Sequence, residues 1–362
     1  VTRPPHPGNR TVTAEHQHLF AMHLTAPRDE GSYGSDNHGM VWGYRFATNG
    51  SAVPISGEAA EAWLQVAPGD DDEFLWLHLS LANTATIPWI EANLRSSAPL
   101  VAALRELNGA TRLEREGDGM LAVLHDVHFD FGFDPAEVST VSLWVDRSLM
   151  LSLRLRPLRS VDQLRLAVRG GQPFRSPADL LAHLLREQAN VLVDIVRHSA
   201  RRVDAMEDRL LAGKLASSRR ELGSLRRVLV RLQRLLAPEP SSLFRILTRP
   251  PRWVGEADHQ ELRQAAEELN AAVADSSALA ERVKLLQEEL VATLSERTNR
   301  TLFVLTFVTV LALPINLTAG LFGMNVGGIP FAQSSSGFAR VSFGLLAATS
   351  LLAFLAVRGR RD

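Results

Sequence analysis

The sequence predicts an α+β/α membrane protein, with an N-terminal α/β/α domain, long stalk helices and two C-terminal transmembrane helices. The first observation is a sharp change in charge: charged side chains occur throughout the chain up to Arg300, and none occurs from Thr301 to Ala339. The second is that no proline interrupts the chain between Pro251 and Pro314, which predicts one exceptionally long helix. The third is a series of short apolar runs in the first half, which is typical of strands.

The composition excludes several classes of protein. The chain has 362 residues and a formal net charge of -1, so it lacks the basic excess of a nucleic-acid-binding protein. The absence of cysteine excludes disulfides and thiolate metal ligands. No HExxH, P-loop or dinucleotide-binding motif occurs, so the sequence predicts neither an enzyme nor a bound cofactor. Residues 1–30 are rich in Pro, Gly and His without the apolar core of a signal peptide, so we expect a mobile arm.

Residues 31–175 are expected to form an α/β domain. Strands are predicted where β-branched, aromatic and other apolar residues form short runs bounded by turn formers. Helical patterns occupy Gly57–Val66 and Ile87–Leu107, the latter interrupted by Pro88 and Pro99. This alternation predicts a small mixed sheet with covering helices. The predicted strands are Gly39–Phe46, Phe74–Leu79, Gly119–His128 and Val141–Arg154, the last as two strands around a turn near Asp146.

Long helices are predicted after this domain. Residues 176–250 are interpreted as a helical hairpin, with Ser176 as N-cap, Pro177 at the first helical position and Pro238 as a stop. Residues 251–300 are interpreted as a stalk that continues into the membrane, in a helix about 100 Å long at ~1.5 Å per residue. The expected helices are Ala178–Ala212, Ser217–Leu236 and Glu256–Phe322.

Two segments are apolar enough to cross a bilayer, whose hydrocarbon core needs roughly 20 residues of helix. They are residues 301–322 and 338–357, joined by an outer loop at 323–337 and followed by a basic tail at 358–362. Arginines precede the first span and follow the second, whereas the loop carries no basic residue. By the positive-inside rule, both termini and the α/β domain are cytoplasmic.

One face of the first span is polar when the helix is divided into heptads. A helix that faces lipid does not tolerate such a stripe, so the stripe packs inward or lines water. We interpret it as the lining of a pore formed by several copies of the helix; the alternative is that its Thr and Asn side chains bond a neighbouring helix. The predicted pore-lining residues are Asn299, Thr306, Thr309 and Asn316, with apolar constrictions at Leu302 and Leu313 that suit gating by dewetting.

The same seam, extended backward along the stalk, contains Glu281 and Glu288. Carboxylates near an oligomer axis would form an inner vestibule that attracts cations. Between Arg297 and Arg361 the chain has no acidic residue. A bare divalent cation needs charged ligands in place of its water. We therefore expect the ion to pass at least partly hydrated, held by amide, hydroxyl and carbonyl dipoles.

The triplet Gly323-Met324-Asn325 stands at the outer end of the first span, between a charged stalk and a short loop. This arrangement resembles the CorA family of metal ion transporters, whose signature is the same triplet. The resemblance implies a funnel-shaped homopentamer in a bacterial inner membrane, with the first span lining the pore. It also implies that Gly323, Met324 and Asn325 form the outer ring that first captures the hydrated cation.

The loop after the triplet is similar to the ZntB branch of that family, because it reads Val-Gly-Gly-Ile-Pro and has no acidic residue. The branch implies zinc as the transported ion, with uptake driven by protons. Gln264 stands where magnesium-transporting members carry a sensing carboxylate, if the stalks align without gaps. Zinc prefers imidazole and thiolate ligands, and no His or Cys follows His259, so the expectation of zinc comes from the resemblance alone.

Two alternatives remain open. One is a passive CorA-like channel for magnesium, cobalt or nickel. The other is a membrane-anchored scaffold or sensor with a helical stalk, against which the inward-facing Asn and Thr residues argue. In the soluble part, His125 and His128 are the residues most like a metal-binding pair, but on a strand they would point to opposite faces.

Overall fold

The computed structural model describes residues 34–66, 73–94, 97–105, 110–212, 215–324 and 334–358. The chain forms two compact units. The first comprises the chain up to His198 together with Arg227–Ala278, and the second comprises Ser199–Arg226 together with the chain from Leu279 onward. The arm predicted at residues 1–30 and the end of the basic tail lie outside the described residues.

The first unit is built around a seven-stranded mixed sheet with the order β2-β1-β3-β7-β6-β5-β4. Neighbouring strands are antiparallel except β3 and β7, which run parallel and pair Leu75 with Leu149. The four predicted strand regions are confirmed, and the last is divided by a turn in which the Asp146 N–H donates to the Leu149 carbonyl (2.9 Å). The strands are β1 (Met40–Phe46), β2 (Ala52–Pro54), β3 (Phe74–Ser80), β4 (Arg112–Glu116), β5 (Gly119–Val127), β6 (Val138–Val145) and β7 (Leu149–Arg154).

The two edge strands, β2 and β4, are absent from the sequence-based prediction. β2 has three residues, and β4 has the sequence RLERE, which is too charged to be recognised as a strand. Pairing with β1 and β5 forms them, so the tertiary environment outweighs their local preference. Charged residues at the edge of a sheet also prevent further strands from adding there.

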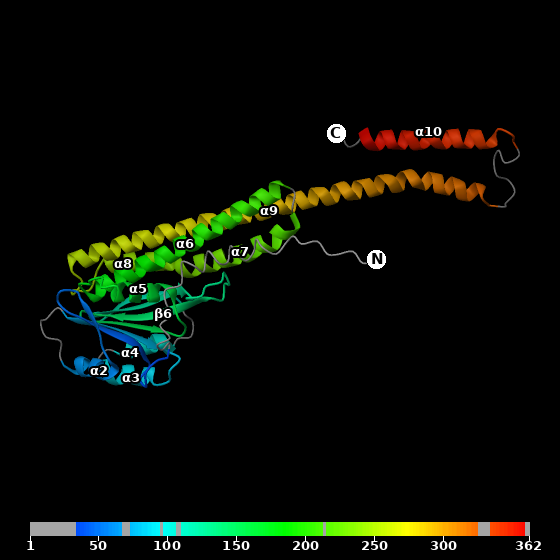
Figure 1. Ribbon diagram of the computed structural model, residues 1–362. Helices are drawn as coiled ribbons and strands as arrows, with labels where there is room; N and C mark the ends of the chain where they lie inside the picture. Colours follow the sequence, from blue (N-terminus) through cyan, green and yellow to red (C-terminus); the bar gives the residue numbers. More distant parts are fainter. Residues whose placement is uncertain are drawn as a thin grey trace, which may run out of the picture. The chain divides into compact units, whose positions relative to one another are not determined.

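Three helices cover one face of the sheet: α2 (Gly57–Gln65), α3 (Thr86–Asn93) and α4 (Ser97–Arg105) (Figure 1). The predicted helical region Ile87–Leu107 forms two helices, because the backbone becomes extended at Leu94 (ψ 123°). Trp89 and Ile90 of α3 are buried with sheet residues such as Leu77 and Leu151. This face is therefore an apolar core of its own.

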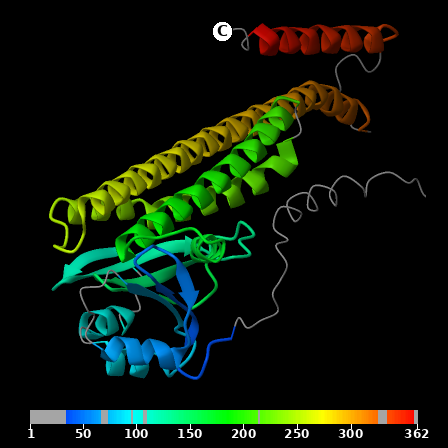
Figure 2. The same ribbon diagram turned by 60° about the vertical axis from the view of Figure 1, so that its left-hand side comes forward.

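The opposite face packs against α5 (Arg159–Arg169), α8 (Pro238–Leu247) and the parts of α6 (Pro177–Leu211), α7 (Leu215–Leu236) and α9 (Glu256–Phe322) that belong to the first unit (Figure 2). The predicted cap of α6 is confirmed: Ser176 Oγ accepts the N–H of Asp179 (3.0 Å). The predicted end of the second helix is confirmed, because α7 ends at Leu236, before Pro238. Pro238 opens α8, because the first position of a helix needs no backbone N–H. Neither α5 nor α8 is predicted from the sequence.

The long third helix is confirmed as α9, which runs from Glu256 to Phe322 with Pro314 inside it. α10 (Gly337–Arg358) follows. Each contains an 18-residue window that is long and apolar enough to cross a membrane and in which at most 6% of the residues are buried in the single chain. Exposed apolar helices of this length require lipid or other protein to cover them.

Candidate functional site

The polar seam predicted on the first span lies on one continuous helix, α9. Asn299, Thr306, Thr309 and Asn316 are all exposed in the single chain. The two predicted constriction residues are exposed as well, Leu302 by 54% and Leu313 by 65%. The seam is therefore available to face copies of the same helix or water. The roles of these six residues stay predictions.

The Thr309 hydroxyl is oriented by the helix itself. Its Oγ1 donates to the Leu305 carbonyl oxygen one turn earlier (2.8 Å). Because the single hydroxyl hydrogen is used within the helix, the lone pairs of Oγ1 are directed outward. An oxygen in this state accepts hydrogen bonds from water bound to a cation. The Thr309 hydroxyl can therefore accept a hydrogen bond from the water of a hydrated cation, but it has no hydrogen left to donate to an anion.

Pro314 changes the backbone of the same segment. Proline has no N–H, so it removes the hydrogen bond that a helix would otherwise make to the carbonyl of Val310. The Val310 carbonyl oxygen, which lacks this helical donor, is a hydrogen-bond acceptor in addition to the Thr309 hydroxyl. The segment consequently offers oxygen acceptors without any ionised side chain.

The helix ends where the signature triplet begins. α9 stops at Phe322, and the Gly323 N–H still donates to the Ala319 carbonyl oxygen (3.0 Å). Met324 follows with its side chain 53% exposed. Asn325 lies outside the described residues, so the outer ring predicted from the triplet stays a prediction.

The two glutamates predicted for the inner vestibule are exposed on α9. Glu281 Oε1 accepts from Lys284 Nζ (2.8 Å), which raises the pKa of Lys284 and offsets part of the negative charge. A straight helix drifts from a heptad repeat by ~20° per heptad, so Glu281 lies about 100° from the face of Asn316. Glu281 and Glu288 face the same axis as the seam only if several copies of α9 wind around one another in a supercoil.

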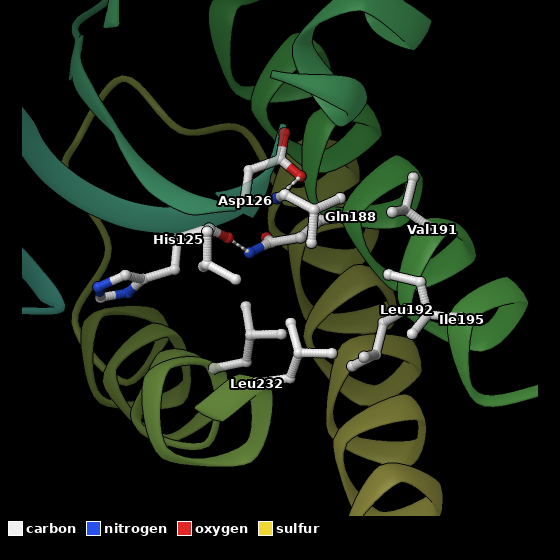
Figure 3. Close-up of a pocket in the computed structure, with 10 residues that line it drawn as sticks. His125, Asp126, Gln188, Val191, Leu192, Ile195 and Leu232 are labelled. Carbon is white, nitrogen blue, oxygen red and sulfur yellow. Dashed lines mark hydrogen bonds between the residues drawn. The ribbon is translucent and has the colours of Figure 1, made fainter. Parts of the chain in front are cut away.

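A buried polar cluster in the first unit is absent from the sequence-based prediction. Hydrogen bonds join His125 of β5 to Gln188 of α6 and Glu239 of α8, and Asp126 is the next residue of the strand; all four are almost completely buried. Figure 3 shows His125, Asp126 and Gln188. Within the described residues, no group of three or more His, Asp or Glu side chains is placed to hold a metal ion. His125 and His128 are both buried, with 4% and 8% of their surfaces exposed. The only sign of this polar cluster in the sequence is that His125 and Asp126 stand together inside the apolar strand β5.

Comparison with known proteins agrees with this arrangement. The model of the family described as CorA-like Mg2+ transporter protein matches residues 71–359. The divalent cation transporter CmaX of Pseudomonas aeruginosa is 30% identical over 312 residues, which cover 84% of this chain and 91% of CmaX. The zinc transport protein ZntB of Pectobacterium atrosepticum is 24% identical over 300 residues, or 83% of this chain and 89% of ZntB.

The fold is matched by a solved structure over almost the whole chain. The structure of full-length CmaX has a TM-score of 0.75 and 25% sequence identity, and the match covers 91% of this chain and 100% of that one. The predicted fold class and family are thus confirmed by sequence and structure together. The chain belongs to the CorA-like Mg2+ transporter family.

Proposed function

We propose that this chain is one subunit of a divalent-cation transporter in a bacterial inner membrane, with the polar seam of α9 lining a central pore. The observation that carries the proposal is that Thr306, Thr309 and Asn316 lie exposed on one face of the uncharged, mainly apolar end of α9, residues 301–322. One helix cannot enclose a pore, so several copies must assemble around an axis. The family resemblance supports five.

Zinc is the proposed ion. A relative is named a zinc transport protein, and the loop after the triplet lacks the acidic residues of magnesium-transporting members. The segment has no ligand that would strip a divalent cation of its water, so selection acts on the hydrated ion. The family description supports a second candidate, a passive channel that also conducts magnesium.

The proposed orientation places both termini and the first unit in the cytoplasm. Arg297 and Arg300 flank the first span, and Arg358 ends α10, whereas the described part of the loop carries no basic residue. Uptake then runs from the loop side past Asn316 and Thr309 toward the stalk.

Flux into proteoliposomes tests the proposal. Purified protein is reconstituted, and zinc and magnesium entry are followed with fluorescent probes, with and without an imposed pH gradient. We expect zinc flux in the wild type and at least roughly tenfold less in Asn325→Ala, because the ring would lose its amide acceptors. Asn270→Ala, an exposed stalk position off the seam, is the matched control.

Each outcome separates the candidates. Zinc flux that grows with the pH gradient supports a proton-driven zinc transporter, whereas equal, gradient-independent flux of both ions makes the protein a passive channel. Wild-type flux in Asn325→Ala removes the proposed outer ring. No flux of any divalent cation supports the scaffold alternative.

A further inference from the structure

The exposed side of α7 carries positive charge that is not neutralised within the single chain. Arg219 and Arg220 stand near the start of the helix, and both are exposed. Arg227 and Arg234 are exposed as well and follow Arg220 at intervals of seven residues, so the three lie on one stripe of the helix. None of these four arginines forms an ion pair within the part of the chain that the structure describes. We call the four the basic face of α7.

The single acidic residue of α7 is already paired with α6. Glu221 Oε1 lies 3.4 Å from Arg202 Nη2, and Glu221 Oε2 lies 3.2 Å from Arg209 Nη1. α6 ends at Leu211 and α7 begins at Leu215, so the two helices form an antiparallel hairpin that these ion pairs hold together. Both carboxylate oxygens of Glu221 are used within the hairpin, which leaves the basic face without a counter-charge.

A second surface, formed by α6 and α9, is acidic. Arg282 Nη2 of α9 pairs with Asp204 Oδ1 (2.8 Å) and Glu207 Oε2 (2.6 Å) of α6, so this side of α9 lies next to α6. The positions seven and fourteen residues after Arg282 continue the same side toward the apolar end of α9, and both are glutamates. We call the exposed acidic residues of this surface the acidic flank; they are Asp208 of α6 with Glu289 and Glu296 of α9.

α9 separates the acidic flank from the basic face. Arg226 Nη1 of α7 donates to Gln287 Oε1 (3.1 Å), so the Gln287 side of α9 lies next to α7. Successive residues of an α-helix are turned by about 100°, which places Glu289 about 200° and Glu296 about 180° from Gln287. Both glutamates therefore point away from α7. The two charged surfaces do not neutralise each other within one copy of the chain.

The two surfaces lie at a similar height along α9. α6 and α9 run in the same direction and α7 returns beside them (Figure 1). Arg219 and Arg220 therefore lie beyond Arg226 in the direction of the apolar end of α9, by six or seven residues or about 10 Å. Because Arg226 is bonded to Gln287, this places the start of the basic face near the height of Glu289.

Copies of a chain arranged around a pore axis contact one another through heterologous interfaces, in which one surface of each copy contacts a different surface of the next. Such an interface needs two complementary surfaces at the same height, because rotation about the axis leaves the height unchanged. We infer that the basic face of α7 docks against the acidic flank of α6 and α9 in a neighbouring copy of this chain. The inference rests on the proposed transport function in requiring several copies around one axis.

The charges select which surfaces come into contact. Exposed ion pairs add little affinity, whereas like charges placed opposite each other are strongly unfavourable. Two basic faces would repel each other, and so would two acidic flanks. The contact between unlike surfaces is therefore favoured over a symmetric dimer, and it leads to a closed ring.

Cross-linking of single cysteines tests the docking, because the chain has no cysteine of its own. Full-length Arg220→Cys and Glu289→Cys chains with different affinity tags are co-expressed, purified in detergent and treated with a short bis-maleimide. We expect a cross-linked dimer that contains both tags. Either variant expressed alone should give roughly tenfold less dimer, because a heterologous ring keeps equal positions apart. Arg220→Cys with Ser241→Cys, an exposed position of α8, is the matched control and should give none.

Charge reversal tests the same contact without cysteines. Arg219→Glu combined with Arg220→Glu places like charges opposite the acidic flank, so the concentration at which half of the assembly dissociates should rise at least about tenfold. Adding Glu289→Arg and Glu296→Arg restores opposite charges and should return this concentration to near the wild-type value, which excludes misfolding as the cause. Arg249→Glu, an exposed arginine beyond α8, is the control and should leave it unchanged. Mass photometry measures the dissociation.

The outcomes separate this inference from the proposed function. An oligomer that conducts a divalent cation but gives no dimer with both tags overturns the docking and leaves the transport function in place. Equal cross-linking of Arg220→Cys alone overturns the docking too, because two α7 helices would then be in contact. A cross-linked ring without flux supports the docking and refutes the transport function. A purified chain that remains a single copy refutes both.

Discussion

At the scale of single residues, buried polar side chains depend on partners from other strands. Ser152 Oγ of β7 accepts from Trp76 Nε1 (2.9 Å) and lies 2.7 Å from His78 Nδ1. The His78 ring is fully buried and stacks on Trp42, with centroids 4.0 Å apart. Burial lowers the pKa of His78 well below its usual value, so this histidine is neutral and relies on hydrogen bonding.

Ser152→Ala tests this dependence. We expect the free energy of unfolding to fall by about 1–3 kcal/mol, because Trp76 and His78 each lose a buried hydrogen-bond partner. Denaturant unfolding in detergent measures the change. Ser139→Ala, half-buried on β6, is the control and should change stability by less than about 0.5 kcal/mol. Equal stability of the two variants would contradict the role given to Ser152.

At the scale of elements, α9 contains both a segment that packs in the first unit and an apolar segment long enough to cross a membrane. Its early turns bury Leu262 and Leu269 against the sheet unit, whereas its last turns expose apolar side chains such as Leu305 and Leu317. The helix is continuous because no proline occurs before Pro314.

The seam on this element makes a second prediction. Thr309→Val keeps the shape of the side chain and removes the oxygen that would accept from ion-bound water. We expect zinc flux to fall about fivefold, equivalent to about 1 kcal/mol. Thr301→Val is the matched control, because its hydroxyl makes the same bond to a carbonyl one turn earlier (Arg297 O, 3.0 Å) but lies off the seam. Equal flux in both variants would refute the pore face.

At the scale of the whole molecule, the distribution of charge predicts the orientation in the membrane. The chain lacks cysteine, so single cysteines report their own accessibility. We expect a membrane-impermeant maleimide to label Ser335→Cys in intact cells and to label Ser241→Cys only after lysis. Both positions are exposed. The reverse labelling pattern would invert the proposed topology.

Much of the fold could be predicted because its signals are local. Apolar runs in β3 and β5, the Ser176–Pro177 start of α6 and the proline-free α9 each carry their own pattern. β4 and α8 have no decisive local pattern. Charged residues dominate β4, and two prolines stand at the start of α8. Both form through contacts made by tertiary structure.

The sequence by itself determined the spans, their flanking charges, the long helix and the polar seam, because each depends on residues close together in the chain. Only the tertiary structure decided the burial of Asp126, Gln188 and Glu239. The hydrogen bond between Asp126 and Ser160 joins residues 34 positions apart in the sequence, and that between Glu239 and His125 joins residues 114 positions apart. The physical reason is that β5 extends beyond the end of β4. The backbone N–H and carbonyl of His125 therefore have no partner strand on that side and bond instead to Glu239 and Gln188 from helices distant in the sequence.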